Sequence, residues 1–122
     1  MSPESADADA TQRVRALAEA ALERKAQNAV ALDVRELTSF ADAFLLLTGT
    51  SDRHVRSVAD SVIEAAKAAG ARPLGIEGED ESRWILIDLG DVVVHVFQEE
   101  AREFYDLDRL WQDAPLIDLA AA

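Results

Sequence analysis

The residues best suited to chemistry lie close together between Asp88 and His95. An imidazole near two carboxylates, Asp88 and Asp91, can bind a metal ion or move a proton. A metal site, however, usually needs three or four converging ligands, and the chain has no cysteine and only one other histidine, His54. The sequence therefore predicts neither a metal site nor a bound cofactor.

A second candidate is the segment 48–51, TGTS, between an expected strand and an expected helix. Backbone amides at such a position can hold a phosphate, and Ser51, Asp52 and His54 invite comparison with a catalytic triad. The segment lacks the lysine of a P-loop, and three residues so close together at one helix start cannot form triad geometry. Helix capping by Ser51 or Thr50 explains the segment better, so no catalytic residue is predicted.

The element that would position His95 is the segment 82–98, which has the densest β-forming sequence in the chain. A two-residue loop at Gly90-Asp91 makes it a β-hairpin with two distinct faces. One face is uniformly aliphatic, and burying it would contribute about 1.5 to 3 kcal/mol per side chain. We expect this face to form core, in three facing pairs: Leu89 with Val92, Ile87 with Val94 and Ile85 with Val96.

The opposite face of the hairpin mixes side chains that a well-packed interior seldom combines. It carries an acid, an imidazole, aliphatic groups and large aromatic rings, so we expect it to be a binding surface. The acidic loop 77–82, EGEDES, borders it and is either a solvated turn or a charged rim. The predicted binding residues of the hairpin are Trp84, Leu86, Asp88, Val93, His95 and Phe97.

The rest of the chain supplies three more strands and three helices. Apolar spacing and helix-stop signals place them around the hairpin, with a possible break in the last helix. The expected helices are 11–28, 52–69 and 99–113, and the expected strands are 29–34, 40–48 and 73–76.

These elements predict a single-domain α+β fold with a mixed five-stranded sheet. Three helices can cover only one face of such a sheet properly, so the mixed face of the hairpin is expected to stay open or meet a partner. The domain is expected to span 11–114, with a flexible N-terminal tail at 1–10 and a C-terminal tail at 115–122.

Charge limits the partners. The chain has 24 acidic and 12 basic residues among 122, for a net charge of −12. This charge repels phosphate backbones and anionic lipid, which argues against nucleic-acid or membrane binding and favours a basic protein partner. No stretch approaches the roughly 20 apolar residues of a membrane span, and the first residues lack a secretory pattern. Together with the absence of cysteine, this predicts a cytoplasmic protein.

Four separated segments resemble one family, in the same order. They are TGTSDRHVRSVAD (48–60), PLGIEGE (73–79), RWILIDLGDVVVHVF (83–97) and REFYDLDRLW (102–111). The chain resembles the ribosomal silencing factor family, RsfS, also called Iojap-related proteins, over residues 31–114.

The resemblance implies a non-catalytic translational repressor. Such a protein binds the large ribosomal subunit through its ribosomal protein fourteen, blocks joining of the small subunit and lowers translation when nutrients are short. The resemblance also implies a nucleotidyltransferase-like fold, although the chain lacks the paired metal-binding acids of those enzymes. Glu77 and Glu79, in the second matched segment, are added to the binding residues.

Two other functions stay open. A small nucleotide-binding or nucleotidyltransferase-type enzyme would use the turn 49–51 and bind nucleotide without a ribosome. A general acidic adaptor would bind several basic proteins, with steep salt dependence and little sensitivity to Trp84. An apolar patch without its partner also makes a homodimer of the free protein plausible.

Overall fold

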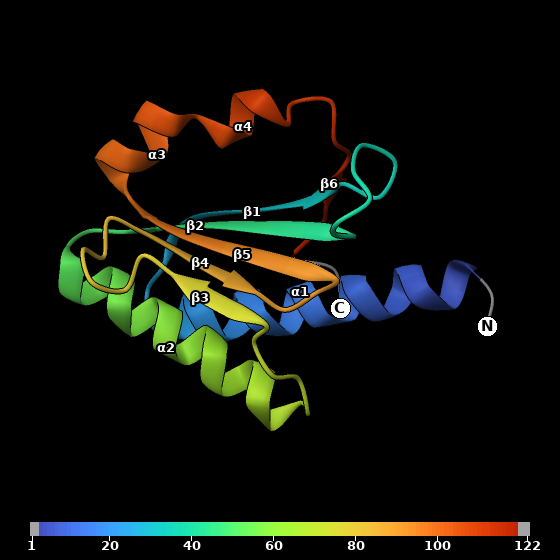
Figure 1. The fold of residues 1–122 in the computed structure, drawn as a ribbon, viewed down its shortest axis with the longest axis horizontal. Helices are drawn as coiled ribbons and strands as arrows, with labels where there is room; N and C mark the ends of the chain where they lie inside the picture. Colours follow the sequence, from blue (N-terminus) through green and yellow to red (C-terminus); the bar gives the residue numbers. More distant parts are fainter. Residues whose placement is uncertain (1–2, 120–122) are drawn as a thin grey trace.

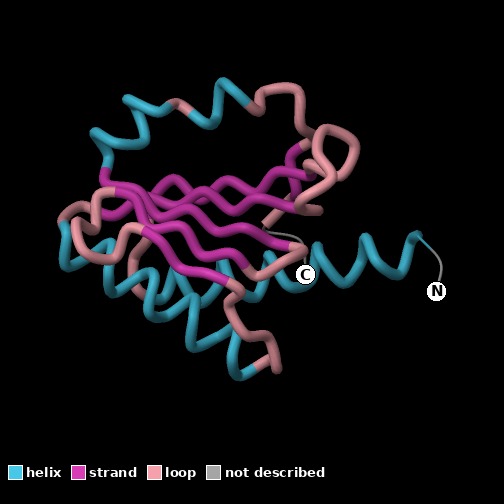
Figure 2. Tube along the Cα trace, viewed as in Figure 1, coloured by secondary structure: helices cyan, strands magenta, loops and turns pink. Residues whose placement is uncertain are grey.

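The computed structural model describes residues 3–119, and six strands form one mixed sheet in the order β3-β4-β5-β2-β1-β6 (Figures 1 and 2). The two central strands, β2 and β5, are parallel, and the other neighbours are antiparallel. The elements are α1 (Pro3–Glu23), β1 (Gln27–Asp33), β2 (Ala43–Gly49), α2 (Asp52–Ala68), β3 (Gly75–Glu77), β4 (Trp84–Asp88), β5 (Val92–Gln98), α3 (Glu99–Tyr105), α4 (Leu107–Leu110) and β6 (Leu116–Ile117).

The hairpin of β4 and β5 has the predicted register. The Leu89 N–H donates to the Val92 carbonyl at 2.9 Å and closes the two-residue loop. All six aliphatic residues predicted for the core lie in the cluster shared with α1 and α2. The facing pairs of the other side are also as predicted: Trp84 with Phe97, Leu86 with His95 and Asp88 with Val93.

Helix α2 begins and ends at the expected signals. The Ser51 hydroxyl accepts a hydrogen bond from the His54 N–H at 3.1 Å, and Gly70 follows the last turn with a φ of +85°. A Cβ at Gly49 would lie 2.8 Å from Val55 Cγ2. Close packing of strand on helix therefore accounts for the glycine of this turn.

Both ends of the chain contribute more structure than the sequence predicts. Helix α1 begins at Pro3, so residues 3–10, predicted to form a tail, are helical. In the predicted C-terminal tail, β6 pairs with β1 and makes the sheet six-stranded rather than five-stranded. Residues 1–2 and 120–122 lie outside the described part of the chain.

Helices lie on both faces of the sheet, which corrects the expectation that they lie mainly on one. Helices α1 and α2 pack on one face, whereas α3, α4 and the segment leading to β6 cover the other (Figure 1). A second, smaller core forms beneath this cover. Its buried members are Leu32, Val34, Ala41, Phe44, Leu46, Val93, Phe97, Ala101 and Ala114.

The break between α3 and α4 determines which of their side chains face this core. Asp106 has a left-handed φ of +50°, which interrupts the helical backbone, so α3 and α4 are two separate helices. Leu107 and Trp111 consequently pack on the second core, whereas Phe104 and Leu110 are 78% and 71% exposed. Within residues 3–119, no helix combines the length and apolar character needed to cross a bilayer.

Candidate functional site

Trp84 is the centre of an aromatic group on the mixed face of the hairpin. Its ring stacks on Phe97 with centroids 5.1 Å apart and lies 4.7 Å from the ring of Tyr105 on α3. The Trp84 Nε1–H donates to His95 Nδ1 at 3.1 Å. These contacts fix the indole, which is only half-buried, so that part of the ring stays accessible.

His95 is a buried, neutral residue rather than a surface group. Only 5% of it is exposed, and burial lowers its pKa from 6.5 to about 4. Since Nδ1 accepts the bond from Trp84, the ring proton lies on Nε2, which has no hydrogen-bond partner among the described residues. His95 therefore orients Trp84 from beneath.

The buried imidazole should make the fold sensitive to mild acid. The pKa of His95 is lower in the folded chain than in the unfolded chain, so the unfolded chain binds more protons between pH 6.5 and 4. The stability is fully present above pH 6.5 and falls as the pH drops toward 4. From pH 7.5 to 5.0 we expect the free energy of unfolding to fall by about 2 kcal/mol, measured by urea titration.

Two glutamine variants separate this effect from other titrations. His95→Gln keeps an acceptor for the Trp84 indole but does not titrate, so its loss between the two pH values should be much smaller than that of wild type. His54→Gln removes the half-buried histidine at the start of α2 and should retain the wild-type loss. Equal losses in wild type and His95→Gln would contradict the assignment.

The acidic loop next to Trp84 is anchored at its end by Ser82, which is fully buried. The Ser82 hydroxyl donates to the Glu79 carbonyl at 2.9 Å and accepts from Arg56 Nη2 of α2 at 3.1 Å. The Gln98 side-chain amide donates to the Ser82 carbonyl at 3.1 Å. The carboxylates of the loop are therefore presented from a fixed backbone.

A cleft of about 390 Å³ lies between this loop and α3. Aromatic rings form one part of its wall and two carboxylates another, with one cation, Arg83, among the lining residues. A cation gains from the face of an aromatic ring and from nearby carboxylates, so this combination suits a lysine or arginine side chain of a partner. The lining residues are Gly78, Asp80, Glu81, Arg83, Trp84 and Tyr105.

Some predicted binding residues lie at the surface near the cleft. Trp84 lines the cleft, and Glu77 is exposed opposite Leu86 on the same side of the sheet. Glu79 is exposed in the anchored loop. The half-buried Asp88 has another task, since its Oδ1 accepts the Gly90 N–H at 2.9 Å and supports the hairpin turn.

Leu86 is half-buried against the second core, and the open surface predicted for the other three residues was wrong. Val93, His95 and Phe97 are 6%, 5% and 1% exposed, because the second core covers them. His95 and Phe97 contact the indole of Trp84 from beneath, whereas Val93 lies opposite Asp88 at the other end of the hairpin. Binding through any of the eight predicted residues stays a prediction.

Five of the six residues that line the cleft were missed: Gly78, Asp80, Glu81, Arg83 and Tyr105. The two acids belong to the loop already identified as a possible rim, so their position could have been inferred. Tyr105 lies in the segment REFYDLDRLW, whose helical spacing predicts an apolar side made of Phe104, Leu107, Leu110 and Trp111 and so passes over the tyrosine. The position of α3 over the sheet places its ring beside Trp84.

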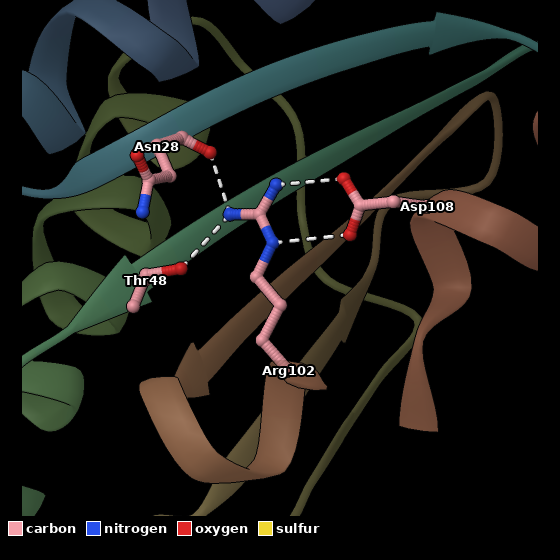
Figure 3. Close-up of polar contacts among 4 residues, drawn as sticks. All are labelled: Asn28, Thr48, Arg102 and Asp108. Carbon is pink, nitrogen blue, oxygen red and sulfur yellow. Dashed lines mark hydrogen bonds and ion pairs between the residues drawn. The ribbon is translucent and has the colours of Figure 1, made fainter. Parts of the chain in front are cut away.

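Arg102 holds the cover of the second core in place (Figure 3). Its Nη1 donates to the Asn28 carbonyl at 2.5 Å and to Thr48 Oγ1 at 2.9 Å, which ties α3 to β1 and β2. Its Nε and Nη2 donate to the two carboxylate oxygens of Asp108 at 3.1 and 2.9 Å. Hydrogen bonding from Arg102 lowers the pKa of Asp108 below its ordinary value.

The described residues offer no centre for metal chemistry. Among them, no group of three or more histidine, cysteine, aspartate or glutamate side chains could hold a metal ion. What the site presents is a rigid aromatic ring, a second ring from α3 and an anchored acidic loop. This arrangement can recognise a cationic surface.

Solved structures share this fold. A crystal structure of a protein from Chromobacterium violaceum matches with a TM-score of 0.81 and 34% identity, covering 91% of this chain and 92% of that one. A crystal structure from Bacillus halodurans matches with a TM-score of 0.74 and 36% identity, covering 84% and 92%.

Sequence comparison agrees with the structural likeness. The chain is 44% identical over 97 residues to the ribosomal silencing factor RsfS of Bacillus subtilis, covering 80% of this chain and 82% of that protein. It is 33% identical over 75 residues to the mouse mitochondrial assembly of ribosomal large subunit protein 1, covering 59% and 33%. The family model described as "Ribosomal silencing factor during starvation" matches residues 7–122, so this chain belongs to the RsfS family.

Proposed function

We propose that this protein is a translational repressor that binds the large ribosomal subunit and blocks joining of the small subunit, lowering translation when nutrients are limited. Its direct partner is a basic ribosomal protein of the large subunit, protein fourteen. Membership of a family of ribosomal silencing factors supports this proposal, as does the mouse relative named for assembly of the large ribosomal subunit.

The observation that carries the proposal is the acidic and aromatic cleft. A net charge of −12 draws the protein to basic surfaces, and the anchored loop presents Asp80 and Glu81 beside the rings of Trp84 and Tyr105. A lysine or arginine of the partner would stack on these rings and pair with the two carboxylates. Such a cation–π contact contributes about 0.5 to 2 kcal/mol, depending on how far water is excluded.

Self-association of the free protein is part of the same proposal. Phe104, Tyr105 and Leu110 are 78%, 48% and 71% exposed on the helices next to the cleft. An exposed apolar surface that lacks its partner tends to meet a copy of itself. Dimerisation of the free protein and binding to the subunit would then compete for one surface.

A pair of matched charge reversals tests the site. We expect the double variant Asp80→Lys and Glu81→Lys to lose about tenfold or more in affinity for purified large subunits in pelleting assays. The control, Asp60→Lys and Glu64→Lys, changes the net charge by the same amount on the exposed side of α2. This control should bind almost as wild type does and should still inhibit subunit joining, followed by light scattering.

The outcomes distinguish the alternatives. Equal losses in both double variants would indicate a general acidic adaptor rather than a docking cleft. Wild-type binding by the Asp80→Lys and Glu81→Lys variant would place the interface elsewhere. Failure of wild type to pellet with large subunits would reject the proposed function itself.

A further inference from the structure

A second surface, at the start of the edge strand β3, has the reverse charge. A cleft of about 670 Å³ lies where the end of α2 meets the start of β3. It is lined by two cationic side chains, Lys67 and Arg72, and by no carboxylate. Neither cation has a hydrogen-bond or ion-pair partner among the described residues. The lining residues are Lys67, Gly70, Ala71, Arg72, Pro73 and Ile76.

The same place is an unprotected edge of the sheet. Strand β3 is the terminal strand and pairs only with β4, so its outer backbone groups have no neighbouring strand (Figure 1). A Cβ at Gly75 would meet nothing within 4 Å, and Leu74 is 75% exposed. An extended peptide can add a strand to such an edge through main-chain hydrogen bonds.

We propose that the β3 edge binds an extended acidic segment of another protein by strand addition. Successive side chains of an added strand alternate between the two faces of the sheet. Ile76 faces the core shared with α2, so side chains of the added strand on that face point toward Lys67 and Arg72. Carboxylates at alternate positions of the added strand would pair with these cations. The methylene groups of the same acidic side chains would pack on the apolar lining residues Ala71, Pro73 and Ile76.

A second copy of this chain fits the edge poorly. Two β3 edges joined by a two-fold axis would bring the cations of one copy toward those of the other, whereas an acidic segment brings carboxylates to them. The cleft is also separate from the acidic cleft at Trp84. The proposal therefore does not depend on binding to the ribosome.

Short labelled peptides test this surface. We expect the hexapeptide VEVEVE to bind, by fluorescence anisotropy, about tenfold or more tightly than VKVKVK, with amide shift changes at Gly75, Ile76 and Glu77 in NMR spectra. The variant Lys67→Glu and Arg72→Glu should lose this binding. The control, Arg53→Glu and Arg109→Glu, reverses two exposed cations elsewhere and should retain it.

Several results would overturn the proposal. These are equal binding of both peptides, unchanged binding by the Lys67→Glu and Arg72→Glu variant, and shift changes confined to the cleft at Trp84. A dimer in sedimentation that this variant abolishes would assign the edge to a second copy instead. A VEVEVE peptide methylated on its backbone nitrogens should bind more weakly, because it cannot donate strand hydrogen bonds; equal binding would reject strand addition.

Discussion

Gly78→Ala is expected to lower the free energy of unfolding by about 3 to 4 kcal/mol, measured by urea titration at pH 7.5. Gly78 is the second residue of the acidic loop and has a φ of +88°, which alanine adopts only with strain. A Cβ there would also lie 2.0 Å from the Trp84 carbonyl oxygen, which belongs to the backbone and cannot rotate away. The loop would have to shift and carry its carboxylates with it.

Gly70→Ala is the matched control for the steric part of this effect. Gly70 has nearly the same φ, +85°, but a Cβ there would meet nothing within 4 Å. Only the backbone strain remains, so a loss of about 1 kcal/mol is expected. Equal losses in the two variants would mean that the contact with Trp84 contributes nothing, and the rim would not be fixed as described.

The hairpin could be predicted to the residue because two independent signals agree. The Gly-Asp loop specifies one register, and in that register one face is uniformly aliphatic; a shift of one residue would move these six side chains to the wrong face. Helix α2 was equally predictable, since Ser51 and Gly70 mark its ends. These are local signals, and local signals can be read from a sequence.

The cover over the mixed face could not be predicted in the same way. A single left-handed residue, Asp106, changes the phase of the helical pattern, so Leu107 turns inward while Leu110 turns outward. The polar atoms of the face also gave a misleading signal. Trp84 and His95 satisfy one hydrogen bond between themselves, which lowers the cost of burying them.

Contacts between residues far apart in sequence position α3, and with it Tyr105. Arg102 of α3 makes these contacts. Asn28 is 74 positions away in sequence from Arg102, and Thr48 is 54 positions away. Asn28 has a φ of +50° and lies at an irregularity in the pairing of β1 with β2. Neither periodicity nor capping signals report such a contact, so the position of α3 over the sheet had to come from the structure.

Arg102→Ala should therefore lower the free energy of unfolding by about 3 kcal/mol and loosen α3 and α4 before the rest of the fold. The side chain of Arg102 is 11% exposed, and its removal leaves the Asn28 carbonyl and the buried Thr48 hydroxyl without this donor. Amide hydrogen exchange should speed up in 99–110 but not in β2 or β5. Restored solvation of Asp108, whose side chain is 40% exposed, limits the loss.

Two control variants separate the effect of the hydrogen bonds that Arg102 donates from the effect of its positive charge. Arg109→Ala removes an exposed arginine from α4 and should change stability by less than about 0.5 kcal/mol. Arg102→Lys keeps the charge but cannot donate hydrogen bonds to Asp108, Asn28 and Thr48 at the same time, so its stability should fall between that of wild type and Arg102→Ala.

Since α3 carries Tyr105 to Trp84, Arg102→Ala should also weaken binding to large subunits, and Arg109→Ala should not. Equal exchange rates for 99–110 in Arg102→Ala and wild type would show that other contacts hold the cover in place.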